Sequence, residues 1–92
     1  MNKKEMGNTI KGLMQHAEIC LDNEAYQELN NVLDIALSIA CAWDLKEIDK
    51  VEEDCKFYRS MARKQISEDM ETIEKEIAKL SKLQEAYTLL QY

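Results

Sequence analysis

The chain has 92 residues, of which 46% are hydrophobic and 33% are charged, a balance that indicates a single globular domain over residues 1–92. It contains no proline and only two glycines, too few turn-forming residues for the hairpins of an all-β fold. The net charge of −6 argues against the extensive basic surface that non-specific binding to a nucleic-acid backbone requires, so we expect no direct nucleic-acid binding.

The hydrophobic residues are not arranged for a membrane or for secretion. No run approaches the roughly 20 apolar residues of a membrane span. Glu5 follows the first lysines where a signal peptide would begin its hydrophobic segment. The three cysteines lack CxxC spacing and are typical of reduced thiols rather than of a disulfide framework. We therefore expect a soluble, cytoplasmic protein with no membrane partner.

The first helix is predicted over about residues 3–21. Asn2 can accept a hydrogen bond from the first turn, and Glu5 follows three residues later, as in a capping box. Gly7 and Gly12 weaken this helix and leave open a later start near Asn8 or Thr9. Apolar residues at alternating spacings of four and three residues share one helix face: Met6, Ile10, Leu13, Ala17 and Cys20.

The second helix is predicted over about residues 23–42. Asp22 is the expected N-cap, with Leu21 and Tyr26 spaced for a hydrophobic staple around it. One apolar stripe recurs along this helix: Tyr26, Leu29, Leu33, Ala36, Ala40 and Trp43. From Ile35 onward the helix is apolar on nearly all sides, which predicts a central helix covered on several sides.

The third helix is predicted over about residues 45–90. Asp44 is the expected N-cap, with Glu47 completing a capping box and Trp43 and Ile48 forming a staple. No glycine or proline interrupts the rest of the chain, although the apolar spacing slips between residues 62 and 70. This slip leaves open a break near residues 65–67. The expected fold is all-α, a helical hairpin followed by a long coiled-coil-like helix. The alternative is an up-down four-helix bundle in which the last helix folds back.

A heptad stripe in the last third of the chain is the most specific functional pattern. Its members follow alternating spacings of four and three residues, and we call them the seam: Ile66, Met70, Ile73, Ile77, Leu80, Gln84 and Tyr87. Gln84 is a polar seam residue of the kind that fixes register. The pattern predicts that the seam is a homo-oligomer interface, most simply of a homodimer.

A cluster of cations suggests a different function. Lys56, Arg59 and Arg63 lie three and four residues apart, so on a helix they share a face that could hold a phosphorylated or nucleotide ligand. The alternative for Lys56 is an ion pair with Glu52, one helical turn away. The acidic residues suggest a further alternative, because small phage-encoded inhibitors that mimic nucleic acid have a similar composition.

Metal binding and catalysis find little support. His16, Cys20, Cys41 and Cys55 are residue types that bind zinc. In an antiparallel hairpin, however, Cys20 lies near the turn, and Cys41 lies roughly 27 Å away at 1.5 Å per residue. His16 is the only histidine, and no serine or cysteine has a recognisable base beside it. We expect no metal, no cofactor and no catalytic residues.

These patterns together predict a non-enzymatic, homo-oligomeric protein-interaction module. Its partners would be a second copy of itself and an unidentified larger protein that it regulates or inhibits. The alternatives are a helical protein that sequesters a small ligand or nucleotide, and an acidic nucleic-acid mimic of phage type.

Overall fold

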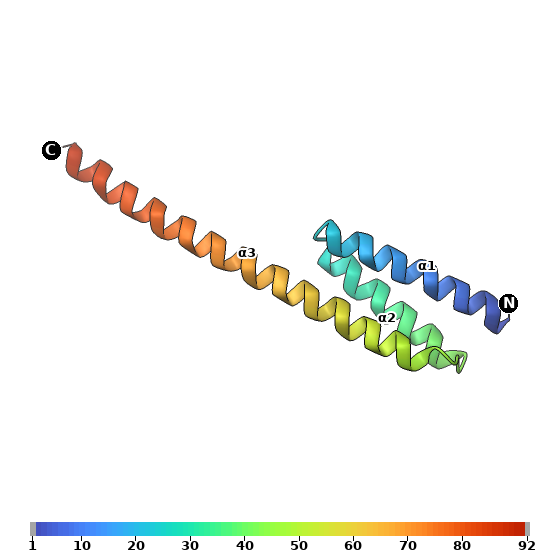
Figure 1. Cartoon of the computed structure of the whole chain (residues 1–92). Helices are drawn as coiled ribbons and strands as arrows, with labels where there is room; N and C mark the ends of the chain where they lie inside the picture. The colour runs from blue at the N-terminus through green and yellow to red at the C-terminus, as the bar shows by residue number, and fades with distance from the viewer. Residues whose placement is uncertain (1, 92) are drawn as a thin grey trace. The chain divides into compact units, whose positions relative to one another are not determined.

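The computed structural model describes residues 2–91 and contains three helices, α1 (Lys3–Asp22), α2 (Tyr26–Ala42) and α3 (Ile48–Leu90) (Figure 1). The prediction of a helical hairpin followed by a long helix is confirmed. Because α3 is continuous over 43 residues, the expected alternatives of a break near residues 65–67 and of a four-helix bundle are wrong. The stretch from Arg63 to Asp69 contains no glycine or proline, the residues at which a helix most readily ends.

The start of α1 is capped as the sequence predicts. The Asn2 side chain accepts a hydrogen bond from the Glu5 amide at 2.9 Å, which satisfies one of the four amides that lack a partner within the helix. Gly7 and Gly12 lie inside α1, and neither interrupts it.

The turn between α1 and α2 differs from the prediction. Asp22 is the last residue of α1 rather than an N-cap, and α2 begins three residues later than expected, at Tyr26. Glu24 adopts the left-handed conformation, with φ 59°. Its amide bonds to the Leu21 carbonyl at 3.2 Å, and the Ala25 amide bonds to the Cys20 carbonyl at 2.9 Å. This pair of bonds is a Schellman motif, so the backbone ends α1 without a glycine.

The second turn repeats this arrangement. Asp44 has φ 49°, and its amide bonds to the Cys41 carbonyl at 3.2 Å, while the Leu45 amide bonds to the Ala40 carbonyl at 3.1 Å. Asp44 therefore closes α2 instead of opening α3, which begins at Ile48. The predicted boundary near residues 43–45 is confirmed, but the predicted N-cap role is wrong. Aspartate serves both purposes, because it caps helices and also tolerates the left-handed region.

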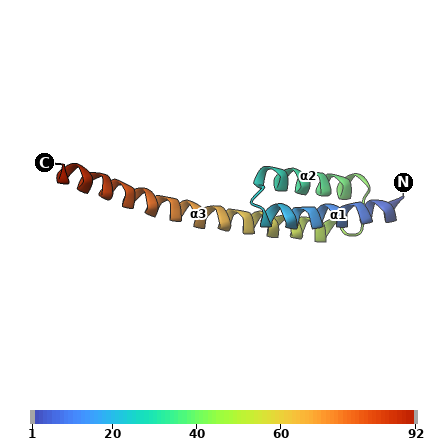
Figure 2. The same cartoon turned by 90° about the horizontal axis from the view of Figure 1, so that it is seen from above.

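Residues up to Ala62 form one compact unit, in which α1, α2 and the beginning of α3 lie side by side (Figures 1 and 2). Its core residues come from all three helices, and the most completely covered large ones are Leu33, Cys20 and Cys55. Cys55 donates a hydrogen bond to the Leu33 carbonyl, with 3.6 Å between sulfur and oxygen. This contact connects α3 to the middle of α2.

The central position of α2 is confirmed only in part. Leu29, Leu33, Ala36 and Ala40 are buried along one stripe, as predicted. Ile35, in contrast, is half exposed, because α2 is covered by two neighbouring helices and its remaining face has no cover within the described residues.

Residues from Arg63 form a second unit, which consists of the rest of α3. Every described side chain in this unit is exposed except the half-buried Gln65. The expected organisation of residues 1–92 as one domain stays a prediction.

Candidate functional site: the apolar seam of α3

The seam lies within the second unit and is exposed along its whole length. The exposed fractions of its large apolar side chains run from 36% at Ile66 to 67% at Tyr87, and Gln84 is exposed as well. Since α3 is a continuous helix, the alternating spacings of four and three residues place the seam on one face. The structure thus keeps the predicted residues together and provides no cover for them within the second unit.

Apolar residues that the sequence analysis did not single out widen this surface toward its C-terminal end. Leu83 is 57% exposed, and Leu89 and Leu90 are exposed by three quarters or more. Leu83 and Leu90 lie seven residues apart, immediately beside the seam, so their heptad spacing was a signal that could have identified them.

The charges around the seam are unevenly divided. Five acidic residues and one lysine lie between residues 68 and 76, which leaves a net charge of −4 there. Two lysines and one glutamate lie between residues 77 and 91, which leaves +1. Lys75 and Glu71 form an ion pair one turn apart, with 3.4 Å between nitrogen and oxygen. The seam therefore joins an acidic half to a weakly basic half.

The cations proposed as an anionic-ligand face have different environments. The Arg59 guanidinium donates to Asn30 Oδ1 at 3.3 and 3.2 Å and to Asp34 Oδ1 at 2.5 Å, so it connects α3 to α2. Lys56 is exposed in the first unit, and Arg63 is exposed in the second. Because a phosphate at Arg59 would have to displace Asp34, this ligand face stays a prediction that the geometry does not favour.

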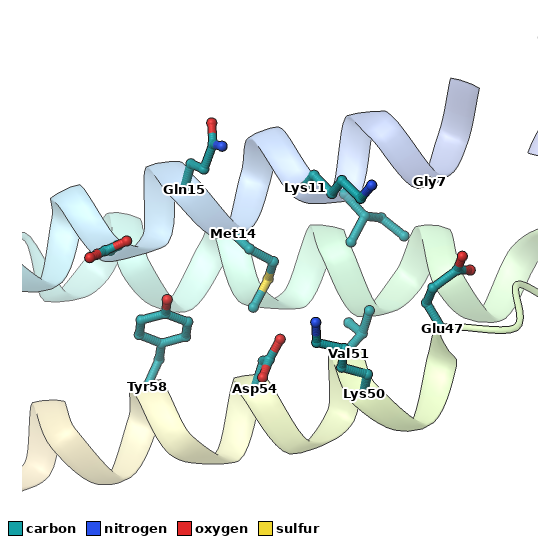
Figure 3. Close-up of a pocket in the computed structure, with 11 residues that line it drawn as sticks. Gly7, Lys11, Met14, Gln15, Glu47, Lys50, Val51, Asp54 and Tyr58 are labelled. Carbon is teal, nitrogen blue, oxygen red and sulfur yellow. The ribbon is translucent and has the colours of Figure 1, made fainter. Parts of the chain in front are cut away.

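A cleft of about 290 Å³ lies in the first unit between α1 and the beginning of α3 (Figure 3). Met14 of α1 points toward Val51 and Tyr58 of α3, and these side chains form an apolar floor. Lys11 and Glu47 are among the charged residues that line it. Burial raises the pKa of the Tyr58 hydroxyl. Charges of both signs line the cleft, so they select no single class of ligand.

His16, Cys20 and Glu28 form a cluster near the turn between α1 and α2. Their ligand atoms lie within 4.8 Å of one another, and His16 Nε2 is 2.7 Å from Glu28 Oε1. Burial raises the pKa of the Cys20 thiol, and the Glu28 carboxylate adds to this effect. The sequence offers Cys41 and Cys55 as further candidate zinc ligands by residue type alone. Neither Cys41 nor Cys55 belongs to this cluster. No local spacing in the sequence marks Glu28 as a member of the cluster, because its approach depends on how α1 and α2 pack.

No helix within the described residues is both long enough and apolar enough to cross a membrane. Comparison with protein families, with curated proteins and with solved structures found no match to this chain.

Proposed function

We propose that this protein is a non-enzymatic protein-interaction module that pairs with a second copy of itself through the seam of α3. The observation that carries the proposal is the exposure of six large apolar side chains along one face of a continuous helix. Their heptad spacing is the spacing at which two helices interlock side chains along a shared axis.

The energetics support pairing rather than an isolated helix. Full burial of a large apolar side chain stabilises by about 1.5–3 kcal/mol, and the seam side chains are already about half covered. Covering the remainder of six side chains therefore contributes roughly 5–9 kcal/mol per chain, or twice that per dimer. Association costs about 4–15 kcal/mol in lost freedom of motion, so a dimer is within reach of the seam alone.

The charges favour a second copy in the antiparallel orientation. Antiparallel pairing places the acidic half of one seam beside the weakly basic half of the other. With the two-fold axis between residues 77 and 80, Ile77 faces Leu80 of the second copy and Met70 faces Tyr87. On the two flanks of the seam, Glu74 then lies nearest Ser81 of the second copy, and Glu76 lies nearest Leu83. No like charges therefore meet across the seam.

A parallel dimer in register is disfavoured by the same charges. It would place Asp69 of each copy beside Glu74 of the other, so this like-charge contact would occur twice in the dimer. It would also align the two acidic halves. Its one advantage is that the two Gln84 side chains would meet and share a hydrogen bond. A repulsive acidic half outweighs this single bond at low salt, where charges are least screened.

Spin-label distances between the two copies test both the pairing and its orientation. A label at Glu68→Cys in a Cys41→Ser background leaves only the buried Cys20 and Cys55 as native thiols. Antiparallel pairing sets Glu68 opposite residue 89, which separates the two labels by roughly 32 Å along the helix axis. Parallel pairing gives almost no axial separation.

A label at Ala78→Cys is the matched control. It lies near the two-fold axis, so it gives a short distance in either orientation. A long distance at Glu68 with a short one at Ala78 is the expected result. Short distances at both positions would overturn the antiparallel orientation, and no intermolecular distance at either would overturn the pairing.

A further inference from the structure

The cluster of His16, Cys20 and Glu28 has the geometry of a small metal site. His16 and Cys20 are one turn apart on α1, the spacing at which two ligands on a helix converge on one ion. Glu28 approaches them from the first turn of α2. All three ligand atoms lie within 4.8 Å of one another, close to the separations that bonds of roughly 2.0–2.3 Å impose on the ligands of one zinc ion.

The chemistry of these three groups matches a divalent ion of the zinc class. They offer one nitrogen, one sulfur and one oxygen, a mixture that suits zinc better than the all-oxygen sites of magnesium or calcium. As ligands, a thiolate and a carboxylate supply two negative charges, which balance the two positive charges of the ion. The site as a whole would then be neutral, so holding the ion against the buried Cys20 carries little electrostatic penalty.

The burial of the three side chains indicates the side from which an ion would enter and the coordination position that would stay open to water. Cys20 is only 2% exposed and lies at the bottom of the cluster. The His16 and Glu28 side chains are 45% and 58% exposed, so they form the mouth. An ion that enters from solvent would separate His16 from Glu28, bind the Cys20 sulfur below, and keep a fourth position toward water.

We propose that His16, Cys20 and Glu28 form a three-ligand site for zinc or a similar divalent transition metal. Binding replaces the contact between His16 and Glu28 with two metal bonds, and the Cys20 thiol releases its proton to solvent as the metal–sulfur bond forms. The ion clamps the end of α1 to the start of α2, on either side of the turn that Glu24 makes in the left-handed conformation. This site lies in the first unit and is independent of the pairing through the seam.

Cobalt(II) is the probe, because its absorption spectrum reports both thiolate bonding and tetrahedral geometry. The reduced full-length protein should bind one cobalt ion per chain, with a sulfur-to-cobalt charge-transfer band, and zinc should displace it. Cys20→Ser should lose the band, and Glu28→Gln should weaken binding by at least roughly tenfold. Glu28 is exposed, so its variant tests the site even if Cys20→Ser destabilises the core.

Cys41→Ser is the matched control, because Cys41 is an exposed thiol on α2 outside the cluster. This variant should bind cobalt as tightly as the unchanged protein and give the same band. The proposal is overturned if the unchanged protein gives no charge-transfer band. It is equally overturned if the band is lost with Cys41→Ser, or if Glu28→Gln binds as tightly as the unchanged chain.

Discussion

The two units of this chain share one apolar spacing but differ in whether the apolar face is buried. In the first unit, apolar residues spaced three and four apart lie against neighbouring helices, and Leu33 and Ala36 are completely covered. In the second unit, the same spacing from Ile66 to Tyr87 leaves each large apolar side chain at least 36% exposed. The spacing therefore identifies which face of a helix needs cover, whereas it does not identify what covers that face.

This difference has a simple origin in the turns. The two Schellman motifs at Glu24 and Asp44 reverse the chain and bring α1, α2 and the beginning of α3 together. No comparable turn follows residue 48, because α3 runs without interruption to Leu90. The apolar face beyond the last turn has no cover within its own unit, and in the proposed dimer a second copy of the chain covers it.

The largest expected effect of a substitution distinguishes the core from the seam. Leu33→Ala should lower the free energy of unfolding by about 2–5 kcal/mol, since Leu33 has no exposed surface and its truncation leaves a cavity. Leu80→Ala on the seam should leave that energy nearly unchanged at concentrations too low for pairing, and should weaken the dimer instead. Urea titrations at low and high protein concentration measure the stability of the single chain and the added stability of the dimer. An equal loss for Leu80→Ala at low concentration would show that the seam belongs to an intramolecular core.

A smaller effect is expected where α3 is attached to α2. Arg59→Ala removes the hydrogen bonds to Asn30 and Asp34, and should lower the free energy of unfolding by about 1 kcal/mol, since these partners are largely exposed. Arg63→Ala is the control, because Arg63 is an exposed arginine of the second unit, and it should change the unfolding energy by less than about 0.5 kcal/mol. If the two variants behave alike, the Arg59 contacts contribute nothing to the first unit.

The smallest expected effect is a gain in stability at the two turns. Glu24 and Asp44 adopt the left-handed conformation, which glycine enters without steric strain. Glu24→Gly and Asp44→Gly should each raise the free energy of unfolding by about 0.5 kcal/mol. This is the net gain, because glycine relieves strain in the folded state but also raises the conformational entropy of the unfolded chain. Asn23→Gly is the control and should lower it, because Asn23 has an ordinary φ of −91°. Thermal melts compare the three variants, and a loss at Glu24 would contradict the description of this turn.

Much of the fold follows from local patterns in the sequence. The apolar spacing and the absence of helix breakers predict three helices, and Asn2 with Glu5 predicts the cap of α1, which is observed. The turns were harder to predict, because Asp22 and Asp44 satisfy the rules for an N-cap. The backbone bonds that close each Schellman motif require only a left-handed residue, for which glutamate gives no sequence signal.

The candidate sites also differ in how far the sequence predicts them. The seam is a property of one helix, so its spacing is visible in the sequence. The approach of Glu28 to His16 and Cys20 depends on the packing of α2 against α1, which no local spacing records. Spacing groups Arg59 with Lys56 and Arg63, whereas the packing of α3 against α2 shows that Arg59 already bonds to Asn30 and Asp34.

Sedimentation equilibrium across the micromolar range tests most directly whether the seam pairs two copies of this chain. The unchanged protein should sediment as a dimer that dissociates on dilution. Ile73→Asp combined with Ile77→Asp should sediment as a monomer that retains the helical circular dichroism and cooperative unfolding of the first unit, because that unit has its own core. Ala78→Asp combined with Ala86→Asp adds the same charge to this helix outside the seam, and should stay dimeric. A monomeric unchanged protein, or a seam variant that is dimeric or unfolded, would contradict this account.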